Sequence, residues 1–295
     1  GTWYWNRYPG ARCDVESMQY SYQFSDELQQ EWDWTERYAT QPEILRYAQY
    51  VAVRFDLCLD ITFKTRVVAA TFDEAATIWR LETDMGETLS ARFCIMATGC
   101  LSSVNQPEFE GLEDFGGPTY HTGQWPHEGV DFTGKTVGII GTGATAVQCV
   151  PHLGAGAKEL FVFQRTPSSI DVRDNKPTDE DWAKSLKPGW QKKRMDNFNI
   201  LVSGGYQDED LVQDGWTDII RNLLFLASNQ GGKQLSASEL EEIGELADFK
   251  KMESIRARVD EVIADSKTAD ALKPWYRQFC KRPCFHDDYL ATFNR

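Results

Sequence analysis

The stretch TVGIIGTGATA, residues Thr136 to Ala146, decides the fold of this 295-residue chain. It begins with an apolar, β-branched run that predicts a strand, and the residues after the glycines predict a helix as far as Leu153. A second apolar run, residues 160–163, predicts another strand and completes a β–α–β unit. Such a unit is typical of an α/β fold with a parallel sheet.

The turn inside this unit follows the pattern G-x-G-x-x-G/A, in which each small residue has its own function. Gly141 allows the tight turn, Gly143 lets the backbone approach a pyrophosphate, and Ala146 permits close packing of helix on strand. The start of the helix adds unpaired N–H groups and the positive end of a dipole, which together bind phosphate. The pattern predicts a dinucleotide site; a glycine-rich turn without a ligand is the alternative.

The end of the second strand indicates which dinucleotide binds. In NAD sites an acidic residue there holds the ribose 2′-hydroxyl. Here the strand ends Gln164-Arg165-Thr166, without an acid. Because Arg165 can pair with a 2′-phosphate through two hydrogen bonds, we expect NADP(H). A surface arginine at a strand end is the alternative.

The segments around this unit have distinct patterns. Residues 1–35 are aromatic and irregular and predict a loop, whereas residues 41–55 predict a helix. Residues 61–93 contain the short strand patterns ITF, RVVAATF, TIWRLET and TLSARF, which predict an antiparallel meander. The run Cys94–Ala97 predicts a buried parallel strand.

Residues 170–275 are polar and predict a helical insertion. Ser236 and Glu239 form a predicted capping box. Apolar residues then recur at helical spacing. These residues are Leu240, Ile243, Leu246, Met252, Ile255, Val259, Val262 and Ile263.

Composition excludes several classes of protein. A net charge of −14 argues against a nucleic-acid binder, and no apolar run approaches the ~20 residues of a membrane span. No secretory signal opens the chain. Seven cysteines without a C-x-x-C pair argue against a metal site and against a redox pair. We expect a cytoplasmic protein with reduced, mostly buried thiols, no metal, and neither nucleic acid nor membrane as a partner.

Residues 115–126, FGGPTYHTGQWP, match the pattern F-x-G-x-x-x-H-x-x-x-W-P, which chance would produce in about one in 10⁵ chains of this size. This pattern is the fingerprint of the Baeyer–Villiger monooxygenases, and the chain resembles that family over nearly its whole length. The opening GTWYWNRYPGARCD, the ATG at 97–99 and the FQRTP at 163–167 support the resemblance. It looks closest to enzymes of the phenylacetone and steroid monooxygenase type. The fingerprint residues are Phe115, Gly117, His121, Trp125 and Pro126.

The resemblance implies two Rossmann-like dinucleotide-binding domains. Residues 1–100 resemble part of the FAD-binding domain with its meander, and residues 101–167 the first part of the NADP-binding domain. Residues 168–279 resemble the helical insertion, and residues 280–295 the return to the NADP-binding domain. The family's first G-x-G-x-x-G and its C-terminal segment are not in the chain, so we expect a fragment with an incomplete flavin domain.

The resemblance also implies a reaction. NADPH reduces FAD, the reduced flavin adds O2, and the flavin peroxide converts a small-molecule ketone into an ester or lactone. The protein supplies placement and electrostatics. Arg282 is expected to stabilise the peroxide and the developing oxyanion, and Asp14 to hold that guanidinium. An ordinary ion pair is the alternative for both residues.

Cofactor contacts follow from the glycine pattern and the resemblance together. Plain core packing is the alternative for each aromatic residue, and a solvated side chain is the alternative for the lysine. The expected FAD contacts are Thr2, Trp3, Tyr4, Trp5, Asp14, Tyr20 and Val67. The expected NADP contacts are Arg12, Cys13, Thr142, Gly143, Ala144, Thr145, Ala146, Val147, Gln148, Arg165, Thr166, Lys281 and Arg282, besides Asp14.

Two further expectations concern the fingerprint and the rival functions. The spacing of His121 and Trp125 predicts one side of a helical turn, and the resemblance implies a role in domain movement. A buried structural histidine is the alternative.

The rival functions are a flavin monooxygenase that oxidises nitrogen or sulfur, a disulfide reductase, and a truncated NADP(H)-binding module without activity. The ending Trp125-Pro126 and Arg282 favour the ketone-oxidising enzyme.

Overall fold

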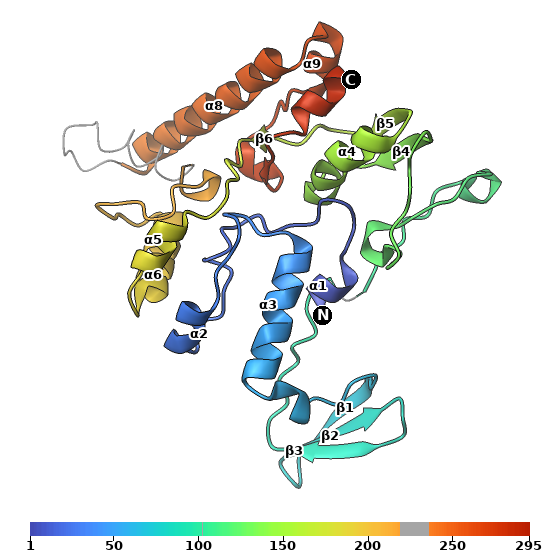
Figure 1. Ribbon diagram of the computed structural model, residues 1–295, viewed down its shortest axis with the longest axis vertical. Helices are drawn as coiled ribbons and strands as arrows, with labels where there is room; N and C mark the ends of the chain where they lie inside the picture. Colours follow the sequence, from blue (N-terminus) through green and yellow to red (C-terminus); the bar gives the residue numbers. More distant parts are fainter. Residues whose placement is uncertain (102, 219–235) are drawn as a thin grey trace. The chain divides into compact units, whose positions relative to one another are not determined.

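The computed structural model describes residues 1–101, 103–218 and 236–295. The chain divides into two compact units (Figure 1). The first unit comprises residues 1–2 and 45–117, and the second comprises residues 3–44 and 118–295. None of the helices in these ranges has the length and apolar character that a membrane span requires.

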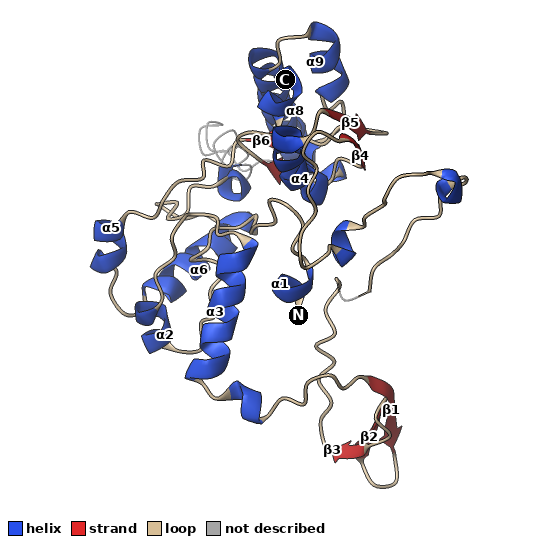
Figure 2. Ribbon diagram, turned by 45° about the vertical axis from the view of Figure 1, so that its right-hand side comes forward, coloured by secondary structure: helices blue, strands red, loops and turns tan. Residues whose placement is uncertain are grey.

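The first unit contains a three-stranded antiparallel sheet, drawn in red at the bottom of Figure 2. Its strands are β1 (Val67–Asp73), β2 (Ile78–Thr83) and β3 (Thr88–Ala91), hydrogen-bonded in that order. A tight turn joins β2 to β3, with the Thr83 N–H donating to the Glu87 carbonyl. The predicted meander is therefore confirmed for three of its four strand patterns.

The first pattern, ITF at 61–63, forms no strand, so that prediction was wrong. A short 3-10 helix, η1 (Leu57–Leu59), precedes it, and Lys64 directly after it has a left-handed backbone with φ 57°. Phe63 already lies in a turn, so too few residues remain between these two features to sustain a ladder, whatever their β propensity.

The predicted strand at Cys94–Ala97 is also absent from the structure. Ile95 is 89% exposed, and Met96 beside it is exposed as well. A parallel strand needs a neighbour to pair its backbone, and the described residues provide none for this run. The apolar sequence therefore indicates a tendency to be buried, but it does not by itself make a strand.

The second unit contains the predicted β–α–β unit. Strand β4 (Thr136–Ile140) pairs in parallel with β5 (Glu159–Phe163), and helix α4 (Ala144–Gly156) connects them. The pairing aligns Val137 with Leu160 and Ile140 with Phe163. This confirms the parallel β–α–β unit predicted from residues 136–163.

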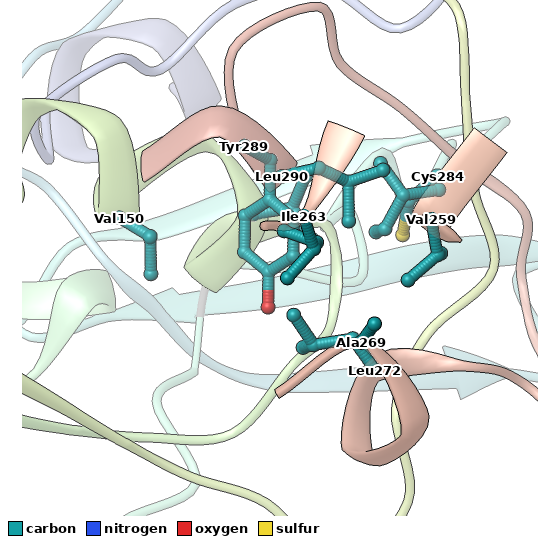
Figure 3. Packing of buried hydrophobic residues seen from close by; sticks show 10 residues of the cluster. Val150, Val259, Ile263, Ala269, Leu272, Cys284, Tyr289 and Leu290 are labelled. Carbon is teal, nitrogen blue, oxygen red and sulfur yellow. The ribbon is translucent and has the colours of Figure 1, made fainter. Parts of the chain in front are cut away.

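The core of the second unit packs against this two-stranded sheet, and Figure 3 shows its buried side chains. Helices α4, α8 (Ala237–Val262) and α9 (Ser266–Leu272) contribute to it, together with the 3-10 helix η5 (Leu290–Asn294). Its buried members are Val147, Val150, Ile170, Val259, Ile263, Ala269, Leu272, Cys284, Tyr289 and Leu290. Burial of each large aliphatic side chain contributes roughly 2 kcal/mol, so this cluster is a main stabiliser of the unit.

The described part of residues 170–275 is largely helical, as predicted. It contains α5 (Glu180–Ser185), α6 (Trp190–Val202), α8 and α9. Ser236 and Glu239 form the predicted capping box at the start of α8. Two of the apolar positions, Leu240 and Leu246, are exposed, because α8 is buried mainly along its second half.

A second small sheet was not predicted. Strand β6 (Ile170–Asp171) pairs in parallel with β7 (Cys284–Phe285), across more than a hundred residues of sequence. Each strand has only two residues, too few for any periodicity to show in the sequence. This pairing brings the segment after β5 beside the segment around residue 282.

The opening segment is mostly irregular, as predicted, but it contains two short helices. They are α1 (Thr2–Trp5) and α2 (Asp26–Glu31), and Ser25 caps the second by accepting the Leu28 N–H. Helix α3 (Gln41–Arg54) agrees with the predicted helix. The remaining 3-10 turns are η2 (Leu112–Asp114), η3 (Thr122–Gln124) and η4 (Gln278–Cys280).

Candidate active site

The carboxylate of Asp14 lies between two arginines of the second unit. Its Oδ1 accepts a hydrogen bond from Nη2 of Arg173 at 2.7 Å, and its Oδ2 is 3.7 Å from Nη2 of Arg282. The side chains of Asp14 and Arg173 are 11% and 3% exposed, whereas that of Arg282 is 65% exposed. The structure thus brings together the two residues predicted as catalytic and adds a third, Arg173, which the sequence analysis missed.

The two-stranded sheet β6–β7 explains how the arginines meet. Arg173 follows β6 by two residues and Arg282 precedes β7 by two, and the strands run in parallel. The Nε of Arg173 donates to the carbonyl oxygen of Phe285 in β7 at 2.9 Å, which ties the two segments together. No local pattern marks Arg173, because its burial depends on a partner strand distant in sequence.

Gln148 of α4 connects the glycine turn's helix to the opening loop. Its Nε2 donates to Asp14 Oδ1 at 3.0 Å and to the Arg12 carbonyl at 3.2 Å. Its Oε1 accepts the Tyr8 hydroxyl at 3.0 Å. Since these contacts occupy the buried amide, Gln148 holds Asp14 in place, and the cofactor contact predicted for it remains a prediction.

Trp216, which lies between α6 and α8 in the sequence, contacts both Asp14 and Arg282. Its indole N–H donates to the backbone carbonyl of Asp14 at 3.0 Å. The guanidinium carbon of Arg282 lies 5.6 Å from its ring centroid, within the range of a cation–π contact. The Trp216 ring also packs on Phe285, with centroids 5.2 Å apart. The sequence analysis missed this residue as well, since one tryptophan among ten carries no distinguishing signal.

The glycine turn is open. Gly141 has φ +110°, a conformation that requires glycine, and its N–H donates to the Phe163 carbonyl at 2.9 Å. Gly143, the residue before α4, has φ −69°, which any residue can adopt. A Cβ at Gly143 would meet no atom within 4 Å. Neither backbone strain nor crowding therefore explains glycine here, and this agrees with a site left clear for a ligand.

The residues expected around a 2′-phosphate lie together at the end of β5. Both Thr142 Oγ1 and Lys281 Nζ donate to the carbonyl oxygen of Thr166, at 2.9 and 3.1 Å. Lys281 also lies 5.3 Å from the ring centroid of Tyr276. Arg165 is exposed and forms no ion pair with any residue in the described ranges. Lys281 and the Thr142 hydroxyl therefore meet at the carbonyl oxygen of Thr166, one residue after Arg165.

The residues in the first turn of α4 are either buried or half-buried. Ala146 and Val147 are buried, and Val147 belongs to the core cluster. Ala144 is half-buried and packs against that cluster, while Thr145 is half-buried one residue on. Their backbone N–H groups at the helix start suit a phosphate, as the glycine pattern implies.

Arg12 and Cys13 precede Asp14 in the opening loop. Arg12 Nη1 lies 3.5 Å from Glu36 Oε2 and donates to the Tyr38 carbonyl at 3.4 Å. Burial raises the pKa of the Cys13 thiol to about 12, so the thiol is protonated and behaves as a small apolar group. The NADP contacts predicted for both residues remain predictions.

All seven cysteines are free thiols, as expected. The expectation that most are buried was wrong. Those buried are Cys13, Cys149 and Cys284. The others are Cys58, Cys94, Cys100 and Cys280, of which Cys94 is half-buried and the rest are exposed.

The aromatic residues expected near FAD form two groups in the second unit. Trp3 donates its indole N–H to the Tyr20 hydroxyl at 3.1 Å, and the two rings meet edge to face. Tyr4, Trp5 and His127 form the other group, with the Tyr4 and Trp5 centroids 4.8 Å apart. Tyr4, Trp5 and Tyr20 are exposed, so core packing does not account for them.

Four predicted site residues belong to the first unit: Thr2, Val67, Phe115 and Gly117. Thr2 begins α1, and Val67 begins β1 with an exposed side chain. A Cβ at Gly117 would lie 2.8 Å from the Phe115 ring, which explains the small residue two positions after the phenylalanine.

The fingerprint residues His121 and Trp125 flank the 3-10 turn η3, so the predicted common side of a helical turn was wrong. His121 Nδ1 accepts the Gly123 N–H at 3.1 Å and caps the turn. Trp125 is buried, with its ring 5.8 Å from that of Tyr120, and Pro126 follows it half-buried. One turn is too short to place residues four apart on one helix face.

Comparison with known proteins identifies relatives of the whole chain. Neopentalenolactone D synthase of Streptomyces avermitilis is 49% identical, and the alignment covers 100% of this chain and 50% of that protein. Baeyer-Villiger monooxygenase ATR8 of Stachybotrys chlorohalonatus is 48% identical, with 100% and 48% covered. This chain thus spans about half the length of the curated relatives that it matches.

The chain is also similar over its whole length to solved structures of monooxygenases. The chain is similar to oxidized steroid monooxygenase bound to NADP, with a TM-score of 0.81 and 39% identity over 100% of this chain and 57% of that one. It is also similar to polycyclic ketone monooxygenase from Thermothelomyces thermophila, with a TM-score of 0.83 and 38% identity over 100% and 50%.

Residues 16–200 match the family described as pyridine nucleotide-disulphide oxidoreductase, and this match covers more than half of the chain. It includes the open glycine turn, the parallel β–α–β unit and, of the four residues described around Asp14, Gln148 and Arg173. The chain belongs to the pyridine nucleotide-disulphide oxidoreductase family.

Proposed function

We propose that this chain is part of an FAD- and NADPH-dependent Baeyer–Villiger monooxygenase, which uses O2 to convert a ketone into an ester or lactone. The names of the relatives and of the similar structures support the reaction class. The observation that carries the proposal for this chain is the pairing of Arg282 with Asp14 at 3.7 Å, in which the Arg282 side chain is 65% exposed and the Asp14 side chain 11%.

Arg282 supplies the positive charge that the reaction needs. A guanidinium stays protonated at every working pH and donates hydrogen bonds in a fixed fork, so it stabilises an oxyanion without losing a proton. Asp14 limits its movement from one side and the Trp216 ring from another. The hydrogen bonds that Arg173 and Gln148 donate to Asp14 hold that carboxylate in place.

NADP(H) fits the residues of the glycine turn. Gly143 leaves room for a pyrophosphate at the start of α4, whose N–H groups would bind it. Arg165 and Lys281 would hold the 2′-phosphate, with Thr166 beside them. The other contacts predicted for Arg12, Cys13 and residues 142–148 belong to the same proposal.

FAD fits the exposed aromatic residues of the opening segment. When bound, it supplies the transfer of electrons from NADPH to O2. Flat rings at Trp3, Tyr4, Trp5 and Tyr20 suit stacking against a flat cofactor. The contacts predicted for Thr2, Val67 and Asp14 complete the proposed flavin set. The predicted domain boundaries and cytoplasmic location remain predictions.

The test compares a ketone with an amine. The whole protein that contains this chain is given NADPH, O2 and either a cyclic ketone or a tertiary amine. We expect a lactone from the ketone and at least a 100-fold lower rate in Arg282→Met, because removal of one oxyanion-stabilising donor costs about that much. Oxidation of the amine alone would favour the nitrogen-oxidising relatives, and NADP⁺ binding without either product would favour the inactive binding module.

A further inference from the structure

Arg173 is a charged residue in an unusual place. Its side chain is 3% exposed, and its guanidinium donates through Nη2 to Asp14 and through Nε to the Phe285 carbonyl. The guanidinium carbon lies 5.8 Å from the ring centroid of Tyr38. The remaining nitrogen, Nη1, is buried and has no hydrogen-bond partner in the described part of the chain.

Stability alone explains such a residue poorly. Removing a guanidinium from water is costly, and a buried ion pair often stabilises a fold less than apolar residues of the same size. Burial accordingly lowers the pKa of Arg173 from its ordinary value, although the nearby Asp14 opposes this. The unpartnered Nη1 adds to the cost. A residue retained at this cost is better explained by the geometry that it imposes.

The hydrogen bond from Arg173 helps to determine which of the two Asp14 carboxylate oxygens faces Arg282. Arg173 and Gln148 both donate to Oδ1, at 2.7 and 3.0 Å. Oδ2 therefore remains for Arg282, 3.7 Å away. The backbone of Asp14 is fixed as well, since Trp216 donates to its carbonyl oxygen. The carboxylate is thus fixed through Oδ1, while Oδ2 faces Arg282.

The net charge of the site also indicates a role for Arg173. Asp14 and Arg282 alone would cancel each other, which would weaken the attraction of the exposed guanidinium for a negative group. Arg173 supplies a second positive charge on the buried side of the same carboxylate. The three groups together keep one net positive charge at a site proposed to bind anions.

We propose that Arg173 is a positioning residue, which holds the Asp14 carboxylate through Oδ1 and thereby fixes the place of the Arg282 guanidinium. This inference rests on the function proposed above for Arg282. It does not make Arg173 a catalytic residue, because its side chain is buried and acts through Asp14.

The test uses the whole protein that contains this chain and a signal that does not depend on its activity. The Nε–H resonance of Arg282 is identified in ¹⁵N spectra as the one lost in Arg282→Lys. We expect Arg173→Met to move this resonance to the position of free arginine, and Arg173→Lys, which keeps the charge but cannot reach both Asp14 and Phe285, to move it part of the way. No movement in either variant would overturn the inference, as would an Arg282 signal already at the free position in the unsubstituted chain.

Arg194→Met is the matched control. Arg194 is similarly buried and pairs with Glu16, another carboxylate of the opening segment, at 2.6 Å. It makes no hydrogen bond to Asp14 in the described ranges. We expect Arg194→Met to lower the urea midpoint about as much as Arg173→Met while leaving the Arg282 resonance in place. Equal movement in both variants would show a general loosening of the fold and would overturn the inference.

A double-mutant cycle on the whole protein connects the inference to the reaction. We expect Arg173→Met to lower the rate of ketone conversion at least 10-fold when Asp14 is present, and less than 2-fold in an Asp14→Asn background, because its effect passes through that carboxylate. Equal losses in both backgrounds would overturn the inference. If the resonance responds as expected but no ketone is converted by the unsubstituted protein, the proposed function fails and the positioning role of Arg173 stands.

Discussion

The hydroxyl of Thr142, inside the glycine turn, donates a hydrogen bond to the carbonyl oxygen of Thr166, 2.9 Å away at the end of β5. Lys281 donates to the same oxygen from the far end of the chain. The turn proposed to bind phosphate, the strand end proposed to select the dinucleotide and the segment that carries Arg282 therefore share one acceptor atom. Changes in any of the three segments are expected to affect dinucleotide binding.

The first prediction concerns the choice of NADP(H) over NAD(H). Replacing Arg165 with alanine should raise the Kd for NADP⁺ roughly 10- to 100-fold, because a charge-assisted hydrogen bond contributes about 1.5–3 kcal/mol. The Kd for NAD⁺ should hardly change, since NAD⁺ lacks the 2′-phosphate. Calorimetric titration of both dinucleotides measures this. Lys176→Ala, which removes an exposed lysine paired with Asp174, is the control. An equal loss for both dinucleotides would contradict the assignment.

The second prediction separates ligand space from backbone strain at the two glycines. Gly143→Ala should cost less than about 1 kcal/mol of stability, because its φ of −69° is open to all residues and its Cβ meets nothing. It should nevertheless weaken NADP⁺ binding at least 10-fold, since the methyl group would stand where a phosphate approaches. Gly141→Ala, with φ +110°, should instead destabilise the fold by about 1–2 kcal/mol.

Urea titration and dinucleotide titration of the same two variants distinguish these effects. If Gly143→Ala binds NADP⁺ as tightly as the unsubstituted chain, the open turn is not the pyrophosphate site. The proposal would then lose its main structural support for NADP(H).

The third prediction compares two leucines that the sequence cannot tell apart. Leu290 is completely buried in the core cluster, and its replacement by alanine should lower the free energy of unfolding by about 2–5 kcal/mol. Leu240 is 51% exposed on α8, and its replacement should change that free energy by no more than about 0.5 kcal/mol. Urea unfolding measures both, and a loss above about 2 kcal/mol in Leu240→Ala would show that another surface covers α8.

The contrast between Leu290 and Leu240 shows which features of the fold a local sequence pattern can predict. Residues 136–163 were predictable because a strand, a glycine turn and a helix each leave a local pattern, and the structure follows it. Leu240 satisfies the helical period as well as Ile255 does, but only Ile255 is buried. Periodicity specifies a face of the helix, and the neighbouring elements decide how much of that face is covered.

The same limit applies to the site. The resemblance identified Asp14 and Arg282 by their positions in the chain, and the structure brings them to 3.7 Å. Arg173 follows a two-residue strand whose partner lies more than a hundred residues away, and it stands in a polar segment where exposed arginines are common. Its role depends on long-range pairing, which no local pattern contains.

The last prediction concerns pH and a histidine without an assigned role. Burial lowers the pKa of His286 from 6.5 to about 4, and its Nδ1 accepts the backbone N–H groups of Asp288 and Tyr289. The folded protein therefore binds this proton less tightly than the unfolded chain. The contribution of His286 to stability is complete above the unfolded pKa of 6.5 and is lost progressively as pH falls to about 4.

His286→Asn removes the titration and keeps an acceptor oxygen near the same N–H groups. Relative to this variant, the unsubstituted chain should lose up to about 3 kcal/mol between pH 6.5 and 4, as measured by urea unfolding at several pH values. The difference between the two proteins is the quantity to compare, because burial raises the pKa of Asp214 to about 6. Asp214 acts in the opposite direction, with stability lost as pH rises through that value, and it does so equally in both proteins. A difference that stays constant over this range would show that His286 is not held neutral in the folded state.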